Sequence, residues 1–546
     1  MVEGTVNEPL ERVAGRIIAL APDVLGVSCY IWNIAYVEAL LPMLRAAFGD
    51  CVIVLGGPEV GYRAEDVLAR CPQADFVLSG EGELPLAMLV DALDGLTLAI
   101  GTEALTIEDA AQQAALAAVP GLCFRTGAGF HEAAPHQHDA MQPSPYSPAY
   151  LDALGGRIAY LETSRGCPYA CAFCLSGRGE TLRQLPMERA RQDILLLANS
   201  GAKTVKFVDR TFNANRARAR DILAFIAREH GRSIPDGVCF HFEIAGDLLD
   251  EDTLALVEAA PKGLFQFEIG PQSMDETTLR LVRRRTDMSH LVRQVVRLIA
   301  CGRAHVHLDL IAGLPDETLA MFARGFDRAY HLRPHTLQLG FLKLLHGSAM
   351  RDQPDVYPCE FDPAPPYQVV STPAMSAEDF AVLTTMERAL DKLHNSGRFA
   401  RTLKWLTEDG GQTPFDLFLL LGQAILAAEQ RAGKPSLSLD ELTDVVHDAL
   451  AAHLPAHAAL LRDLLLMDRL SSTPTTVLPR SLKRGDPRYH TVKRALHRRF
   501  PRENKPRASG FLYERGGDTA VWCDYDKKDP VTGLYALQQA SVADIL

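Results

Sequence analysis

The chain has 546 residues, of which 47% are apolar, so it can build large cores and the length favours three or four domains. Its 56 basic and 68 acidic residues give a net charge of −12, which argues against a protein that coats nucleic acid. The eleven cysteines form no small-domain disulfide pattern, no N-terminal signal pattern is present, and the longest strongly apolar stretch is too short to span a bilayer. We therefore expect a cytoplasmic protein that does not enter a membrane.

The first region, residues 1–130, alternates short apolar runs with amphipathic helical patterns. Buried strands are predicted at 24–28, 52–55 and 76–78, with a helix over 35–48 between the first two. Strands that alternate with helices indicate an α/β fold with a doubly wound parallel sheet.

Polar and glycine residues follow each of these strands, where a doubly wound sheet binds its ligand. Glycine allows a flat or phosphate-bearing ligand to approach the backbone, although a turn alone would also account for it. The residues at the three strand ends are Ser28, Cys29 and Tyr30, then Gly56, Gly57, Pro58 and Glu59, and finally Gly80 and Glu81.

Residues 131–152 include a stretch rich in proline, histidine and serine and are interpreted as a linker. Strand–helix units then repeat over residues 153–370. The six strand candidates are 157–162, 204–208, 239–244, 264–269, 305–311 and 336–342. Six units predict a partial (β/α)6 barrel, in which chemistry takes place at the carboxyl ends of the strands.

A loop directly after the first barrel strand carries Cys167, Cys171 and Cys174 with the spacing C-x3-C-x2-C. Three thiolates can hold three irons of a [4Fe–4S] cluster and leave the fourth iron open, whereas ferredoxin-type carriers supply four cysteines. A zinc knuckle normally shows a fourth ligand, and the nearest downstream histidine is His230. Buried structural cysteines are a further alternative, but three within eight positions of a Gly/Pro loop are an improbable core.

The third region, residues 371–546, has mainly helical periodicity. Ser376 with Asp379 and Ser438 with Glu441 fit capping boxes. Residues 480–507 are basic and are a candidate RNA surface, although a solvated helix face is the favoured interpretation.

The cysteine run, with Phe173 before its last cysteine, resembles the signature of the radical S-adenosylmethionine (SAM) enzymes. Together with the preceding doubly wound domain and its segments 54–59 and 79–83, the chain resembles the cobalamin (B12)-binding radical SAM class over residues 1–350. The third region resembles the C-terminal extension of an uncharacterised subgroup of that class.

The resemblance implies that SAM chelates the open iron and that the barrel strand ends hold its other groups. Asp209 and Arg210 match a segment that contacts the methionine amino group, and Glu243 a position near the ribose. Phe173 is expected at the adenine. The remaining matched positions are Glu268, Gln272, Ser273 and Asp309.

Two features depart from the class. The motif Asp-x-His-x-x-Gly is absent, so no lower axial histidine is offered to cobalt. Residues 4–7 resemble the second strand of the cobalamin domain, and no first strand precedes them. We therefore expect either a start further upstream or a degenerate domain that lacks its first strand, in which the third strand exposes an unpaired edge.

The resemblance implies a radical SAM enzyme that cleaves SAM and, with cobalamin, methylates an unactivated carbon of a small molecule. A flavodoxin- or ferredoxin-type protein would supply electrons. A radical rearrangement or cyclisation without methyl transfer is a second hypothesis. A non-catalytic iron–sulfur or corrinoid sensor or scaffold is a third.

Overall fold

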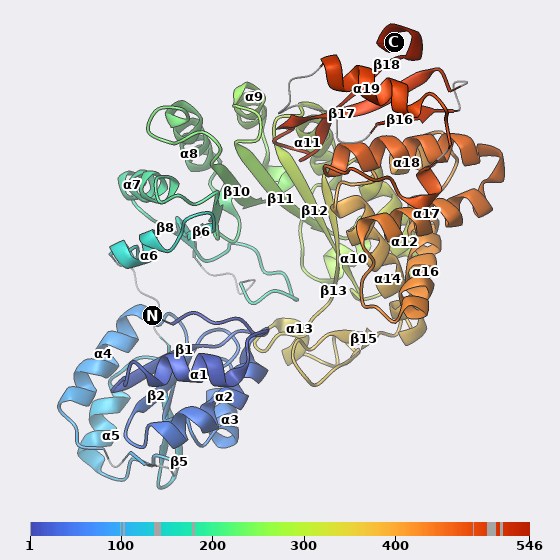
Figure 1. Ribbon diagram of the computed structural model, residues 1–546. Helices are drawn as coiled ribbons and strands as arrows, with labels where there is room; N and C mark the ends of the chain where they lie inside the picture. The colour runs from blue at the N-terminus through green and yellow to red at the C-terminus, as the bar shows by residue number, and fades with distance from the viewer. Residues whose placement is uncertain are drawn as a thin grey trace. The chain divides into compact units, whose positions relative to one another are not determined.

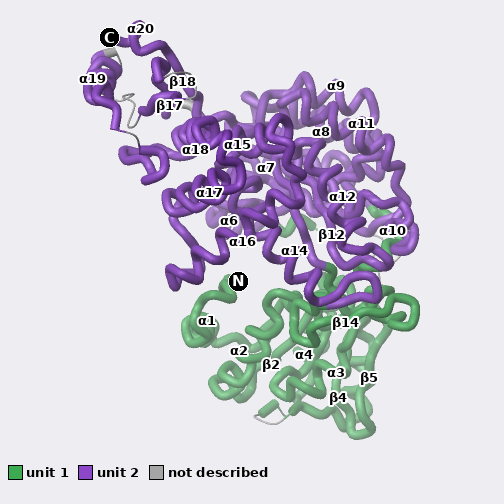
Figure 2. The backbone as a smooth tube through the Cα atoms, turned by 90° about the vertical axis from the view of Figure 1, so that its right-hand side faces the viewer, with its two compact units in different colours: residues 1–145, 169–183, 342–370 green, residues 146–168, 184–341, 371–546 purple. Residues whose placement is uncertain are grey.

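The computed structural model describes the chain except residues 1, 99, 102–103, 136–142, 177–180, 484, 500–508 and 514–516. It divides into two compact units, shown in Figure 2. Unit 1 comprises residues 1–145, 169–183 and 342–370, and unit 2 comprises residues 146–168, 184–341 and 371–546. Two pieces of the region predicted as the barrel, 169–183 and 342–370, therefore belong to the unit that contains the N-terminal domain.

Unit 1 contains a five-stranded sheet with the order β1-β2-β3-β4-β5. The parallel strands are β1 (Val24–Ser28), β2 (Val52–Gly56) and β3 (Phe76–Leu78), and the antiparallel hairpin is β4 (Leu122–Thr126) and β5 (Gly129–Glu132). The helices are α1 (Leu10–Ile18), α2 (Ile34–Ala47), α3 (Ala64–Arg70), α4 (Glu83–Asp94) and α5 (Ala110–Ala117).

Apolar cores lie on both faces of this sheet. Ile53 and Leu55 of β2 pack in one core with α1, α2 and α3, and the alternate residues Val52 and Val54 pack in another with α4 and α5. A fully buried parallel strand of this kind is hydrophobic on both faces. The predicted doubly wound fold is confirmed.

The strand predicted over residues 4–7 is wrong. These residues form a turn in which the Glu8 amide donates to the Thr5 carbonyl, 3.0 Å, and α1 begins at Leu10. Val6 is the one apolar side chain of this run and is 48% exposed, so a strand here would bury almost nothing. Within the described residues, β1 is the edge strand of the sheet.

Unit 2 contains a six-stranded parallel sheet with the order β13-β12-β11-β10-β9-β6 (Figure 1). The strands are β6 (Ile158–Leu161), β9 (Thr204–Phe207), β10 (Cys239–Ile244), β11 (Phe265–Gln272), β12 (His305–Ala312) and β13 (Thr336–Phe341). The helices among them are α7 (Met187–Ala198), α8 (Arg216–Glu229), α9 (Glu251–Ala259), α10 (Glu276–Leu281), α11 (Met288–Ala300) and α12 (Leu319–His331). The predicted partial (β/α)6 barrel is confirmed.

Strands β10, β11 and β12 of the barrel alternate strictly between buried and half-buried residues. One face carries fully buried phenylalanines, among them Phe207, Phe240, Phe242, Phe265 and Phe267. The other face carries the polar residues that form the candidate site.

The C-terminal part of unit 2 is mainly helical and ends in a three-stranded antiparallel sheet. Its helices are α14 (Ala377–Ala389), α15 (Ala400–Glu408), α16 (Pro414–Ala432), α17 (Leu439–His453), α18 (Ala458–Ser472) and α19 (Tyr489–Arg499), and its strands are β16 (Ser509–Leu512), β17 (Thr519–Lys528) and β18 (Tyr535–Ser541). Both predicted capping boxes are present. No helix in the described ranges is long and apolar enough to cross a membrane.

Helices α14 and α16 cross at Gly422, where a Cβ atom would lie 2.2 Å from the Thr385 carbonyl oxygen. We expect Gly422→Ala to destabilise the protein by about 1–3 kcal/mol, because the methyl group must push two packed helices apart. Thermal unfolding followed by circular dichroism measures this. Gly15→Ala is the control, since Gly15 lies in α1 with nothing within 4 Å of an added Cβ, and should leave the midpoint unchanged or raise it. Equal midpoints for Gly422→Ala and wild type would contradict the packing argument.

Candidate active site

The cysteine loop follows the carboxyl end of β6. Cys167 and Cys171 are buried, Cys174 is half-buried, and none of the three forms a disulfide. The Cys174 amide donates to the Cys171 carbonyl, 3.1 Å, which closes a tight turn around Phe173. Cys167 precedes this turn, and three thiols within one short stretch of chain fit the donor set of an iron–sulfur cluster. The boundary between the two units falls inside this loop, after Pro168.

Asp209, after β9, holds the beginning of this loop. Its carboxylate accepts hydrogen bonds from the Thr163 amide and hydroxyl, both 2.6 Å, and from the Ser164 hydroxyl, 3.0 Å. Asp209 is 1% exposed, and burial raises its pKa against the lowering effect of these bonds. Its predicted contact with the SAM amino group stays a prediction, and its observed partners give it a structural role. Arg210 is exposed.

Titratable side chains occupy neighbouring positions on the half-buried face of the barrel strands. The six residues are Lys206, His241, Glu243, Glu268, His307 and Asp309. The Lys206 ammonium lies 3.3 Å from Glu243 Oε1 and 3.2 Å from Glu268 Oε2. Glu268 Oε2 also lies 2.8 Å from His241 Nε2, and His307 Nε2 lies 3.0 Å from Asp309 Oδ1.

This environment gives the neighbouring carboxyl groups of Glu243 and Glu268 different pKa values. The hydrogen bond from His241 lowers the pKa of Glu268 to about 2, whereas burial and the nearby Glu268 raise the pKa of Glu243. Ligand atoms of Glu268, His307 and Asp309 lie within 4.8 Å of one another, a spacing that suits a cation or the hydroxyl and amino groups of an organic ligand.

The sequence predicted Glu243, Glu268 and Asp309 but not Lys206, His241 or His307. Each missed histidine precedes a predicted acid by two residues. Since side chains two residues apart in a strand lie on the same face, this spacing could have predicted the histidines from the sequence. The sequence also did not predict that the Arg284 guanidinium donates to the Gly270 carbonyl of β11.

Gln272 and Ser273 follow an irregularity at the end of β11. Gln272 has φ +69° and its amide group folds back over Gly270. The Ser273 hydroxyl is buried and lies 2.5 Å from Glu317 Oε1. Burial raises the pKa of Glu317 to about 7. Contacts of Gln272 and Ser273 with a cofactor stay predictions.

In unit 1, the loop after β1 presents a flat aromatic surface. Tyr30 stacks on Trp32 with ring centroids 4.5 Å apart and planes 7° apart, and Trp32 is 66% exposed. Asn33 fixes this loop, since its side chain accepts from the Tyr30 amide, 2.7 Å, and donates to the Ser28 carbonyl, 2.9 Å. Exposed stacked rings fit a planar ligand. Trp32 was not predicted.

The glycine loop after β2 packs closely on the β1 loop. Gly57 has φ +107°, and a Cβ there would lie 2.5 Å from the Cys29 carbonyl oxygen, so only glycine fits. Cys29 is fully buried, whereas Ser28, Pro58 and Gly80 are exposed and Gly56 is half-buried. These exposed strand ends leave backbone that a ligand could contact.

The two predicted acids of unit 1 pair with other parts of the same unit. Glu59 is 3% exposed and accepts from Arg63, 2.6 Å, and from the Tyr367 hydroxyl, 2.5 Å. Glu81 forms an ion pair with Arg183. Their predicted contacts with cobalamin stay predictions.

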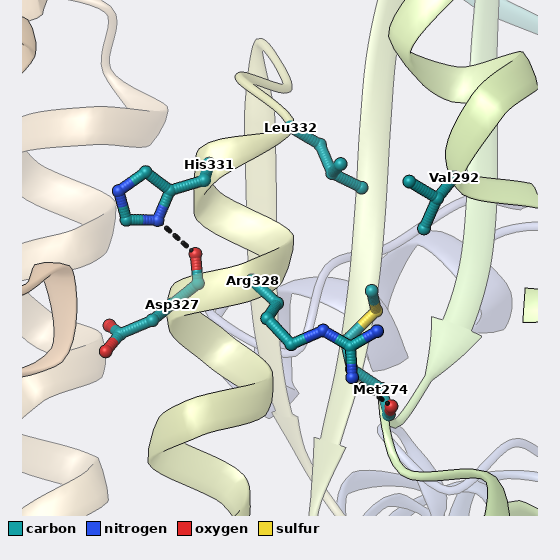
Figure 3. Close-up of a pocket in the computed structure, with 6 residues that line it drawn as sticks. All are labelled: Met274, Val292, Asp327, Arg328, His331 and Leu332. Atoms are coloured by element: carbon teal, nitrogen blue, oxygen red, sulfur yellow. Dashed lines mark hydrogen bonds between the residues drawn. The ribbon is translucent and has the colours of Figure 1, made fainter. Parts of the chain in front are cut away.

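A cavity of about 380 Å³ in unit 2 lies apart from these residues (Figure 3). Its lining residues are Met274, Val292, Asp327, Arg328, His331 and Leu332. The Asp327 carboxylate accepts from the Phe415 amide, 2.8 Å, and its carbonyl lies 2.6 Å from His331 Nδ1. None of these residues belongs to the predicted site.

Three family models match the chain. Residues 1–90 match the B12 binding domain, residues 161–329 the radical SAM superfamily, and residues 355–508 a family described as a protein of unknown function, DUF4080. The chain therefore contains a radical SAM domain and a B12-binding domain. This confirms the resemblance, and the two domains imply the predicted cofactors: a [4Fe–4S] cluster with SAM, and cobalamin.

Curated relatives include several methyltransferases. A 2-(S-pantetheinyl)-carbapenam-3-carboxylate methyltransferase of Streptantibioticus cattleyicolor is 29% identical over 35% of this chain and 28% of its own length. The cobalamin-dependent radical SAM methyltransferase TokK of Streptomyces tokunonensis is 27% identical over 58% of this chain and 46% of its own length. The chain thus spans less than half the length of these two relatives.

The fold is similar to that of solved radical SAM enzymes. The cobalamin-dependent enzyme OxsB matches with a TM-score of 0.55 and 13% identity over 85% of this chain and 73% of its own. The methyltransferase TsrM of Kitasatospora setae matches with a TM-score of 0.50 and 16% identity over 63% of this chain and 68% of its own.

We expect Asp209→Asn to weaken the cysteine loop. The amide presents an N–H₂ group to donors that need an acceptor, which costs about 2 kcal/mol locally. Iron retained after anaerobic reconstitution and gel filtration should fall about twofold or more. Asp236→Asn, at a side chain that is 85% exposed, is the control. Unchanged iron retention in Asp209→Asn would show that the loop does not depend on this carboxylate.

Glu317 predicts a pH dependence of stability. The folded protein keeps a proton on this carboxyl group between the ordinary glutamate pKa of 4.5 and the raised pKa of about 7, whereas the unfolded chain has released it in this range. Stability therefore falls as the pH rises through this window, by on the order of 3 kcal/mol. Glu317→Gln should remove this loss, and urea midpoints at about pH 5 and about pH 8 measure it. The exposed Glu276→Gln should keep the wild-type slope, and the same slope in Glu317→Gln would contradict the assignment.

Proposed function

We propose that the chain is a radical SAM enzyme that methylates an unactivated carbon of a small molecule with the help of cobalamin. The observation that carries this proposal is the C-x3-C-x2-C loop at the carboxyl end of the first strand of a six-stranded parallel barrel, in a chain that also holds a B12-binding domain. The methyltransferases among the relatives support the reaction type. The cysteine chemistry favours a reducing cytoplasm and a flavodoxin- or ferredoxin-type electron donor.

Each group of residues has a task in this proposal. Cys167, Cys171 and Cys174 hold the cluster, and Asp209 holds the loop that carries them. Glu243, Glu268 and Asp309 offer carboxylates to the amino and hydroxyl groups of SAM, while Lys206 keeps the first two from repelling each other. Tyr30 and Trp32 offer a flat surface to the corrin ring. When bound, the cluster supplies the electron that cleaves SAM, and cobalamin supplies the methyl group.

A radical cyclisation without methyl transfer is the second candidate. An anaerobic magnesium-protoporphyrin IX monomethyl ester cyclase of Cereibacter sphaeroides is 23% identical over 59% of this chain and 52% of its own length. SAM labelled in its methyl group separates the two reactions, because the label enters the product only if the methyl group is transferred.

The cofactor content tests the proposal directly. After anaerobic reconstitution with iron, sulfide and hydroxocobalamin, we expect about four irons and about one cobalt per chain. With a strong reductant, the protein should convert SAM to 5′-deoxyadenosine, and Cys171→Ala should abolish this conversion. Cys301→Ala, at a half-buried cysteine outside the loop, is the control. A loaded protein that leaves SAM intact would contradict the enzyme and favour a sensor or scaffold.

A further inference from the structure

Residues 342–370, here called the strap, fold with unit 1 although the chain around them builds unit 2. The strap includes α13 (Ala349–Asp352), β14 (Glu360–Phe361) and the beginning of β15 (Val369–Ser371). Its two ends are joined, because the Leu344 amide donates to the Tyr367 carbonyl, 3.0 Å, and the Val369 amide donates to the Leu342 carbonyl, 2.8 Å. The strap is therefore a closed loop with its own hydrogen bonds.

One side of the strap is bonded to the loop that follows β2. The Tyr367 hydroxyl donates to Glu59, 2.5 Å, and Arg63 donates to both Glu59, 2.6 Å, and the Tyr367 oxygen, 3.1 Å. Tyr367 and Glu59 are 2% and 3% exposed. If one of these three side chains is removed, the atoms that it bonded to lose a hydrogen-bond partner, which costs stability.

The Tyr367 ring is itself held from two sides by the strap. The Arg351 guanidinium lies 4.8 Å from the ring centroid, and the His346 ring meets it edge-on at 5.0 Å. The close approach of Gly347 to Tyr62 adds a second contact with the same loop, since a Cβ on Gly347 would lie 2.5 Å from the Tyr62 ring. The Tyr367 ring is thus closely packed, and a shift of Glu59 or of the loop after β2 would be passed on to the strap.

The strap is also bonded to the cysteine loop. The Met350 amide donates to the carbonyl of Ala172, 3.0 Å, and Ala172 is fully buried between Cys171 and Phe173. Met350 lies in the first turn of α13, where Ser348 caps the helix, so its amide is not needed for the helix and is available for this bond.

We propose that the strap couples the corrinoid loop, residues 57–63, to the cluster loop, so that occupancy of one site changes the affinity of the other. Tyr367 and Met350 are its two positioning residues. The inference rests on the proposed function, because it takes cobalamin and the cluster as the two ligands. Coupling of this kind is reciprocal and typically changes an affinity about fivefold or more.

The test is the affinity of the full-length chain for hydroxocobalamin, measured anaerobically by equilibrium dialysis before and after reconstitution of the cluster. In wild type, the cluster should tighten hydroxocobalamin binding about fivefold. Tyr367→Phe removes the hydroxyl that reaches Glu59 and should bring this ratio close to one with the iron content unchanged. Tyr357→Phe, at another buried tyrosine of the strap, should keep the wild-type ratio.

Met350 gives an independent pair of variants. Met350→Pro removes the amide that donates to Ala172, and Met350→Ala loses the side chain but keeps the amide. Only the proline variant should lose the coupling. A ratio close to one in wild type, or a wild-type ratio in both Tyr367→Phe and Met350→Pro, would overturn the strap proposal while cobalamin still binds. No binding of hydroxocobalamin by wild type would overturn the proposed function as well.

Discussion

The candidate sites depend on buried carboxylates whose oxygens are occupied by several donors at once. Asp209 accepts three hydrogen bonds from Thr163 and Ser164 and thereby fixes where the cysteine loop begins. Glu59 does the same for the loop after β2, with Arg63 and Tyr367 as donors. A buried carboxylate is costly to desolvate, so it persists only where the geometry of its partners is well defined. These acids therefore determine the positions of the loops on which ligands could be bound.

The polar face of the barrel follows a different rule, because its charges are only half-buried. Lys206 lies between Glu243 and Glu268, so the two acids can occupy neighbouring strands without a strong mutual repulsion. His241 then distinguishes them, since it bonds to Glu268 and lowers its pKa to about 2, while burial raises the pKa of Glu243. Two neighbouring carboxyl groups with different proton affinities can serve a ligand that carries both amino and hydroxyl groups.

Strand periodicity predicted the two parallel sheets, and the cysteine spacing picked out a candidate cluster loop, because both signals are local. A buried parallel strand is a continuous apolar run, and a ligand loop is a short motif. The hairpin of β4 and β5 was missed, since residues 129–132 have no such run and, among the described residues, β5 pairs only with β4. The strand over residues 4–7 was predicted from the family resemblance, and it was wrong because a run with a single apolar residue has no face to bury.

The roles of the single residues could not be predicted from the sequence, because their partners lie far away along the chain. Whether Asp209, Ser273 or Glu59 is available to a ligand depends on Thr163, Glu317 and Tyr367, which lie 46, 44 and 308 residues away. No local pattern connects such positions. The return of residues 342–370 to unit 1 is the same kind of long-range fact, and it became visible only through its contacts with Glu59 and Ala172.

The C-terminal region of unit 2 contributes to the barrel at the opposite ends of its strands. In the turn between β17 and β18, Asp529 pairs with Lys262, and Val531 offers its carbonyl to His305 Nδ1, 3.2 Å, at the start of β12. Burial lowers the pKa of His305, and its Nε2 lies 3.1 Å from the Thr336 hydroxyl oxygen. Asp309 lies further along the same strand, so this turn contacts the amino end of a strand that carries a residue of the polar face. Residues 529–531 follow the DUF4080 match, which covers residues 355–508, and they support the strand that carries His307 and Asp309 of the polar face.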